Sequence, residues 1–162
     1  MTEPLFHMVP GGPRPVAPFS HAVEADGWLF LTGQMPTDPQ APDAPLPEGI
    51  EAQTVRVMEN LRLILQGVGL DLSHVVQMRA YLTAFDRDYA AFNATYETFF
   101  AADRRPARTT VGVTALANGH FMNLHRDEAA LTRTDDLWLD VGAASADDVG
   151  AMGIRLLDPV VR

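Results

Sequence analysis

The chain has 162 residues, of which 47% are apolar, and a formal net charge of −9 at pH 7. This length suits one domain with its own core. No apolar run approaches the roughly 18 residues of a membrane span. The absence of cysteine excludes disulfides and thiolate chemistry. The acidic balance argues against a nucleic-acid partner, and because the first residues show no secretion signal, we expect a soluble cytoplasmic protein with no membrane partner.

The N-terminal part of the chain predicts a hairpin after an extended lead-in. Residues 1–18 are rich in proline and glycine, so we expect no regular element there. Asp26-Gly27 is a two-residue signal for a type I′ turn between strands 20–25 and 28–32. The second arm is apolar from Trp28 to Leu31, which predicts that both of its faces are covered. Gly33 then allows a close approach of another group to the backbone.

Two helices and a strand are predicted next. Apolar residues recur every three to four positions from about Ile50 to Val68, and Gly69 suits the end of such a helix. Residues 75–82 are typical of a core strand. Asp86 is a candidate cap for a second helix. That helix carries five aromatic residues that we interpret as core: Tyr89, Phe92, Tyr96, Phe99 and Phe100.

Arg108 is the leading candidate for a functional residue. Pro106 must end any helix before it, because proline lacks an N–H and fixes φ. Arg108 then opens an alternating run to Val113 that predicts a strand. A guanidinium at the mouth of a strand can hold a carboxylate through two parallel hydrogen bonds. The alternatives are a solvated surface arginine and a salt bridge between chains.

The element order β-β-α-β-α-β-β, with a last strand from about His120, predicts an α+β fold. Two helices would cover one face of a mixed sheet. The other face must then be polar or meet another chain. Residues 127–162 do not continue this order of strands and helices, and they hold eight acidic residues against three arginines. We therefore divide the chain into a domain over 1–126 and an acidic extension of unknown role over 127–162.

Histidine spacing gives no metal site. His120 and His125 are five residues apart, so on a regular strand they would point to opposite faces. The other histidines show no ligand spacing either. We expect no metal.

Five motifs follow one another along the chain: Ala17–Val23, Leu31–Gln34, Gln53–Leu61, Asn93–Phe100 and Arg105–Arg108. In this order they resemble the RidA family of reactive-intermediate (enamine/imine) deaminases. The resemblance implies a chorismate-mutase-like fold, a homotrimer, and ligand clefts that are each lined by two neighbouring chains. It also implies hydrolysis of small enamines or imines to a 2-keto acid and ammonia, with no metal or organic cofactor and with a small carboxylate-bearing metabolite as partner.

The resemblance assigns roles to particular residues. Arg108 would grip the substrate carboxylate, and the backbone at Gly33 and Thr110 would line the cleft. Asn93 is similar to a cleft residue of the family. Thr32 stands where members usually carry serine, and Phe19 stands where many carry tyrosine, so a hydroxyl is lost there. The substrate-binding set is thus Phe19, Thr32, Gly33, Asn93, Arg108 and Thr110.

One departure from the family concerns the last strand. Deaminating members carry a glutamate there that positions the attacking water. An ungapped alignment puts Asn123 at this position, and a short insertion puts Arg126 there. An asparagine can hold a water but cannot take its proton, and a general base is typically worth ~10²–10⁴ in rate.

Three functions therefore remain open. The first is deamination with Arg108 and Asn123 as catalytic residues. The second is a non-catalytic member that binds small carboxylates such as 2-keto acids, or proteins. The third is a different reaction in the same cleft, and among these RNA cleavage is disfavoured by the charge of −9.

Overall fold

The computed structural model describes residues 3–116, which belong to the first of two units of the chain, Met1–Leu124. The second unit, His125–Arg162, and the strand predicted from His120 lie outside the described residues. The strands are β1 (Leu5–His7), β2 (Ala22–Ala25), β3 (Trp28–Leu31), β4 (Gln77–Leu82) and β5 (Ala107–Gly112). The helices are α1 (Ile50–Gly67) and α2 (Phe85–Tyr96), with short 3₁₀ turns η1 (Leu72–His74) and η2 (Glu97–Phe99).

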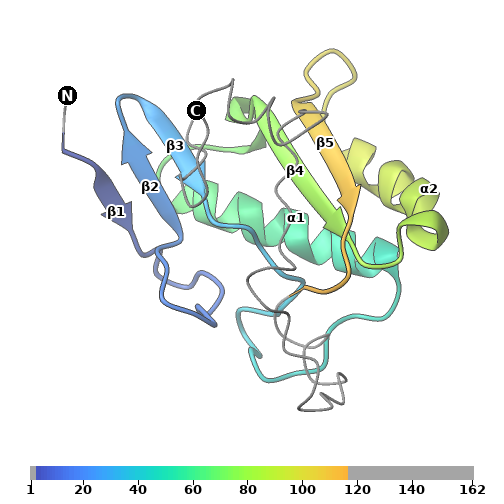
Figure 1. Ribbon diagram of the computed structural model, residues 1–162. Helices are drawn as coiled ribbons and strands as arrows, with labels where there is room; N and C mark the ends of the chain where they lie inside the picture. Colours follow the sequence, from blue (N-terminus) through green and yellow to red (C-terminus); the bar gives the residue numbers. More distant parts are fainter. Residues whose placement is uncertain (1–2, 117–162) are drawn as a thin grey trace, which may run out of the picture. The chain divides into compact units, whose positions relative to one another are not determined.

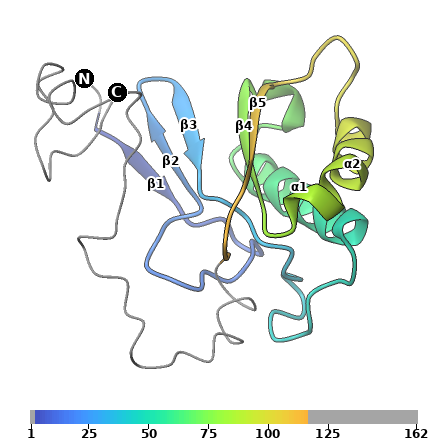
Figure 2. The same cartoon turned by 45° about the vertical axis from the view of Figure 1, so that its right-hand side comes forward.

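The described strands pair in two groups. β1, β2 and β3 form an antiparallel sheet in that order, and β4 pairs with β5 in parallel. The two helices pack against each other and lie on one side of the strands (Figures 1 and 2). The predicted α+β class, with two helices on one face of mixed strands, is confirmed. The division at residue 126 stays a prediction.

The larger of two hydrophobic clusters in the described residues ties both groups of strands to the helices. Its buried members from the helices include Met58, Leu65 and Phe92. Leu31 of β3 and Met78 of β4 pack against the same cluster. Each fully buried side chain of this size contributes about 1.5–3 kcal/mol, so the core fixes α2 against β4, and β4 pairs with β5, where the candidate site lies.

Two turn predictions are confirmed in detail. Asp26 and Gly27 both have positive φ, 47° and 78°, as a type I′ turn requires. At the end of α1, Gly69 has a φ of 79°. The N–H groups of Gly69 and Leu70 donate to the carbonyls of Gln66 and Leu65, which is the Schellman arrangement.

The prediction that residues 1–18 hold no element is wrong. Leu5–His7 form β1, which pairs with β2 so that Phe6 faces Val23. Buried His21 ties down the loop that follows: its Nδ1 accepts from the Val9 N–H at 2.9 Å and its Nε2 donates to the Pro13 carbonyl at 2.8 Å. Tertiary pairing therefore imposes a strand on a segment too short to show a period.

The second helix also begins differently from the prediction. Its N-cap is Ala84, which provides no side-chain hydrogen bond, and Asp86 lies in the first turn. A carboxylate there favours the helix through the dipole rather than through a cap. The helix ends at Tyr96, with η2 continuing to Phe99, so Pro106 stands in a loop and not at the end of the helix.

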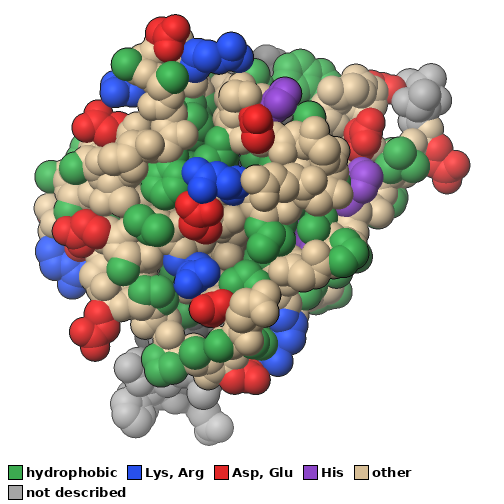
Figure 3. All heavy atoms as spheres, turned by 180° about the vertical axis from the view of Figure 1, so that it is seen from behind, with side chains coloured by type: hydrophobic (Ala, Val, Ile, Leu, Met, Phe, Trp, Pro, Cys, Tyr) green, Lys and Arg blue, Asp and Glu red, His purple; other side chains and the backbone are tan. Residues whose placement is uncertain are grey.

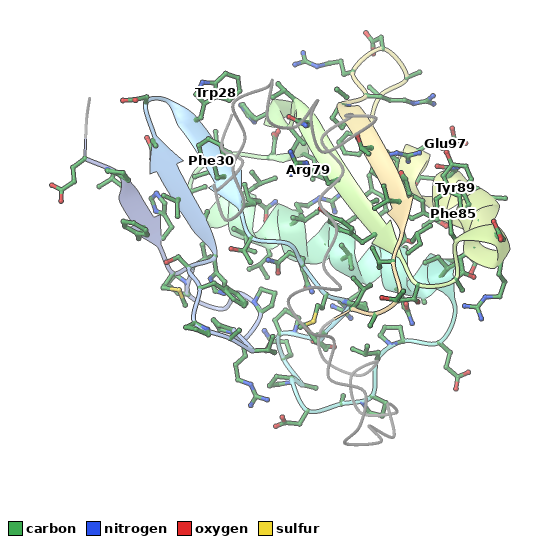
Figure 4. All side chains as sticks on the ribbon, in the orientation of Figure 1. Trp28, Phe30, Arg79, Phe85, Tyr89 and Glu97 are labelled. Carbon is green, nitrogen blue, oxygen red and sulfur yellow. The ribbon has the colours of Figure 1, made fainter. Side chains whose placement is uncertain are left out.

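Within residues 3–116 only one face of β3 is covered, so the prediction that both faces are covered is not met by the described part of one chain. Leu29 and Leu31 face the core, but Trp28 is 60% exposed and Phe30 is 62% exposed (Figure 4). Phe30 pairs with Val23, which also pairs with Phe6 of β1, itself exposed. The sheet thus presents an apolar row on the side away from the helices.

The side of the molecule in Figure 3 mixes basic and acidic side chains, and no basic stripe runs across the described residues seen there. Several arginines within residues 3–116 form ion pairs, among them Arg56–Asp38 and Arg62–Glu59. Within residues 3–116, neither helix has the length and apolar character needed to cross a membrane.

Candidate functional site

Arg108 is the second residue of β5 and lies on the side of the strand that faces the helices. Along β5, Arg108 and Thr110 are half-buried, whereas Ala107 and Thr109 are exposed. Met78, the register partner of Arg108 on β4, packs against the core. The alternation predicted from the sequence is therefore present, and it directs the guanidinium toward α2.

Arg108 contacts three residues of α2. Its Nη2 donates to Oδ1 of Asn93 at 2.6 Å. The guanidinium carbon lies 4.5 Å from the ring centroid of Tyr96 and 5.2 Å from that of Phe92. These are cation–π distances, worth about 0.5–2 kcal/mol each, depending on solvation.

No carboxylate within residues 3–116 forms an ion pair with Arg108. The contrast with most other arginines of the same region is clear, since these have acidic partners: Arg14–Asp43, Arg56–Asp38, Arg62–Glu59, Arg87–Asp88 and Arg105–Glu97. A guanidinium carries five N–H donors, and Arg108 gives one hydrogen bond to a neutral amide. The site thus holds a half-buried cation whose charge the described residues leave uncompensated.

Two hydroxyl groups beside this cation are buried and have no hydrogen-bond partner among the described residues: Tyr96 Oη and Thr110 Oγ1. Burial raises the pKa of the Tyr96 phenol, and the nearby charge of Arg108 opposes that rise. The phenol is therefore neutral at physiological pH and cannot serve as a counter-ion to Arg108.

The predicted residues of the N-terminal region are not joined to this cluster by hydrogen bonds. Thr32 Oγ1 donates to the Ser20 carbonyl at 2.7 Å, and its N–H donates to the His21 carbonyl at 3.1 Å. Phe19 is half-buried. A methyl group on the Cα of Gly33 would meet no described atom within 4 Å. The structure thus joins Arg108 to Asn93 and sets Thr110 on the same face of β5 as Arg108. Phe19, Thr32 and Gly33 stay predictions, and Asn123 and Arg126 lie outside the described residues.

Sequence reasoning missed the two rings that hold Arg108. Phe92 and Tyr96 were interpreted as core, and both are indeed buried. They also form the surface on which the guanidinium stacks. The available signal was Asn93, a polar residue set between the two aromatic positions of one helical face.

A hollow separate from the Arg108 cluster lies at the start of α1 and is lined in part by Gly49, Gln53 and Thr83. Arg87 and Asp88 also line it, and Arg87 Nε donates to Asp88 Oδ1 at 2.6 Å. This hydrogen bond lowers the pKa of Asp88. The pair neutralises itself, so the hollow offers no net charge to a ligand. No group of three or more histidine or acidic side chains in residues 3–116 has the arrangement of a metal site.

Comparison with known proteins adds the family. Residues 11–124 match the family described as Endoribonuclease L-PSP. Protein DfrA of Myxococcus xanthus is 41% identical over 109 residues, which cover 66% of this chain and 81% of that protein.

Two crystal structures show the same arrangement of the chain. RidA from the Antarctic bacterium Psychrobacter sp. PAMC 21119 superposes with a TM-score of 0.65 at 30% identity and covers 71% of this chain and 90% of its own. TdcF of E. coli with bound serine superposes with a TM-score of 0.61 at 25% identity and covers 68% of this chain and 87% of its own.

Proposed function

Since this chain belongs to the Endoribonuclease L-PSP family, the family of the RidA and YjgF proteins, we propose that it hydrolyses small 2-imino or enamino acids to 2-keto acids and ammonia. The observation that carries the proposal is the state of Arg108. It is half-buried, it is held in place by Asn93, and no acidic side chain of the described residues neutralises it. A site built in this way is ready for an anionic ligand.

Arg108 would bind the substrate carboxylate. Its planar fork can donate two parallel hydrogen bonds to one carboxylate, and such charge-assisted bonds are about twice as strong as neutral ones. A related structure, TdcF, holds serine, which carries a carboxylate of the same kind. We assign the same anchoring role to Arg108 in this chain.

Asn93 would complete the anchor. Its Oδ1 accepts from Arg108, so its Nδ2 carries donors that point elsewhere and can serve the same ligand. The Thr110 hydroxyl has no described partner and lies two residues along the same face of β5. We place Phe19, Thr32 and Gly33 at the far wall of the cleft, which a neighbouring chain would complete.

The chemistry itself needs little beyond this anchor. A water adds its oxygen to the carbon of the C=N bond, and its proton passes to the imine nitrogen. The resulting carbinolamine then collapses to a C=O bond and releases ammonia. Fixing the carboxylate places the adjacent C=N carbon at a defined position, and such positioning alone can supply several kcal/mol. Asn123 would hold the water without acting as a base.

We further propose that the chain forms a homotrimer. The support is the apolar row on the exposed side of β1–β3, with Trp28 and Phe30 more than half exposed. Monomeric proteins rarely leave large apolar patches uncovered. Analytical ultracentrifugation should give three times the chain mass of 17.7 kDa, and a sedimenting species of single-chain mass would refute the two-chain cleft.

One observation favours a second candidate, in which the site binds 2-keto acids without turning them over. The described contacts of the Arg108 guanidinium are an amide and two aromatic rings. None of these accepts a proton readily at neutral pH. RNA cleavage remains a weaker alternative, since the chain carries a net charge of −9.

The deciding experiment supplies freshly generated 2-aminoacrylate or 2-iminobutanoate and follows ammonia and keto-acid release. We expect release above the spontaneous rate, and we expect Arg108→Ala to abolish the excess. Arg104→Ala is the matched control, because Arg104 lies in the loop that leads into β5 and makes one long hydrogen bond, 3.5 Å, to the Ser73 carbonyl. Spontaneous rates with calorimetric binding of 2-oxobutanoate would support the binding protein, and neither signal would end both proposals.

A further inference from the structure

The rings of Phe92 and Tyr96 form the surface against which the Arg108 guanidinium rests. The two residues lie one turn apart on α2, and their ring centroids are 5.6 Å from each other. Both side chains are buried, at 7% and 5% exposure. The surface is therefore fixed by the core and cannot rotate away from Arg108.

The ring of Tyr96, and not its hydroxyl, makes the contact with Arg108. The guanidinium carbon lies 4.5 Å from the ring centroid, whereas the hydroxyl is buried and has no hydrogen-bond partner among the described residues. An unpaired buried hydroxyl costs about 1–3 kcal/mol. Removing that hydroxyl should thus leave the contact with Arg108 intact.

A second arginine–aromatic contact in the same region provides a comparison. Arg62 lies 5.5 Å from the ring centroid of Phe99. Arg62 also donates to both carboxylate oxygens of Glu59, at 2.6 and 2.8 Å, so its charge and its orientation are set by an acid. Arg108 has no such acid among the described residues, where Asn93 and the two rings hold its plane.

We propose that Tyr96 is a positioning residue for Arg108: its ring, with that of Phe92, holds the guanidinium plane so that the donors not used by Asn93 face one ligand carboxylate. The inference deepens the proposed function and rests on it. Neutral rings orient the cation and leave its charge in place. An acidic residue at the same position would cancel that charge. The arrangement therefore favours planar bidentate carboxylates over ligands that offer a single acceptor.

The first test of the proposal is independent of any ligand. The arginine Nε–H signals of the full chain are recorded by ¹H–¹⁵N NMR, and the Arg108 signal is assigned by its absence in Arg108→Lys. Ring stacking should shift the Arg108 signal away from that of Arg79, whose guanidinium makes no hydrogen bond, ion pair or ring contact within residues 3–116. An unshifted Arg108 signal in the wild type overturns the proposal even if no Tyr96 variant folds.

The second test compares three variants. Tyr96→Leu should return the Arg108 signal toward that of Arg79 and weaken 2-oxobutanoate binding about tenfold, as loss of a cation–π contact and of the orientation predicts. Tyr96→Phe should keep both the signal and the affinity within about twofold. Phe99→Leu is the matched control, which should move only the Arg62 signal and leave the affinity unchanged.

The outcomes separate the two levels of inference. Wild-type affinity in Tyr96→Leu overturns the positioning role, and so does an equal loss in Tyr96→Phe, which would assign the effect to the hydroxyl. If the wild-type chain neither releases ammonia above the spontaneous rate nor binds 2-oxobutanoate, the proposed function fails, while the NMR signals still decide whether Tyr96 holds Arg108.

Discussion

Two sets of buried polar groups, in two regions of the molecule, differ in how they are paired. In the first set, His21 uses both ring nitrogens in hydrogen bonds and Asn60 uses its amide nitrogen twice, although His7 Nε2 of β1 is buried without a hydrogen-bond partner among the described residues. The Nδ2 of Asn60 donates to the carbonyls of Met35 and Thr37, both at 2.9 Å. Around Arg108, by contrast, the hydroxyls of Tyr96 and Thr110 are buried without described partners.

Both regions contain residues that carry the family resemblance, so the motifs alone do not distinguish their roles. The hydrogen bonds do. A buried group whose donors and acceptors are paired inside the chain stabilises the fold. A cation beside unpaired hydroxyls adds little to stability and much to the binding of a ligand. The same kind of side chain, asparagine, occurs in both regions and allows a direct test.

The largest effect is expected for Asn60→Ala. The side chain is 1% exposed and holds the loop after β3 through two carbonyls. Its loss leaves both carbonyls unpaired and opens a small cavity, which should lower the free energy of unfolding by about 2–4 kcal/mol. Urea unfolding measures this loss. The affinity of the folded fraction for 2-oxobutanoate should not change. A change in that affinity would mean that Asn60 also contributes to ligand binding.

Asn93→Ala is the matched change in the other region. Asn93 is half-buried, and its side chain is hydrogen-bonded to Arg108 alone among the described residues. Water can replace that bond, so stability should fall by less than about 1 kcal/mol, while the freed guanidinium should bind 2-oxobutanoate about five- to tenfold less tightly. Calorimetry and urea unfolding on the same sample separate the two quantities. A stability loss as large as that of Asn60→Ala would make Asn93 a structural residue.

The sequence predicted much of the fold, and two of the residues it singled out are in contact in the structure. Long periodic segments such as α1 and strong turn signals such as Asp26-Gly27 were identified correctly, because their information is local. Arg108 and Asn93 were singled out separately, and the structure joins them at 2.6 Å. Their contact depends on how α2 packs against β5, which no local pattern encodes.

Other features were beyond local reasoning for identifiable reasons. β1 has three residues, fewer than a period needs, and forms because β2 offers it an edge. The exposure of Trp28 and Phe30 was missed because an apolar run shows that a surface must be covered but not by which chain. The role of Tyr96 was hidden because a buried aromatic residue is normally core, and here it is core as well.

The smallest predicted effect is a pH dependence that comes from Tyr96. Burial raises the pKa of its phenol above the ordinary value of 10.0, although the charge of Arg108 opposes the rise. Below pH 10.0 the phenol is protonated in both the folded and the unfolded chain, so the stability that comes from its raised pKa is fully present. As the pH rises past 10.0, the unfolded chain ionises first and this contribution is lost up to the folded pKa.

Unfolding of the wild type and of Tyr96→Phe across this range provides the measurement. The difference in unfolding free energy between the two should be constant from about pH 7 to about pH 9 and should then move in favour of Tyr96→Phe above about pH 10. A difference that stays constant to about pH 11 would mean that the phenol ionises alike in both states. Water would then reach the Tyr96 hydroxyl in the folded chain. Tyr96 would differ in this respect from His21 and Asn60, whose buried polar atoms are hydrogen-bonded within the chain.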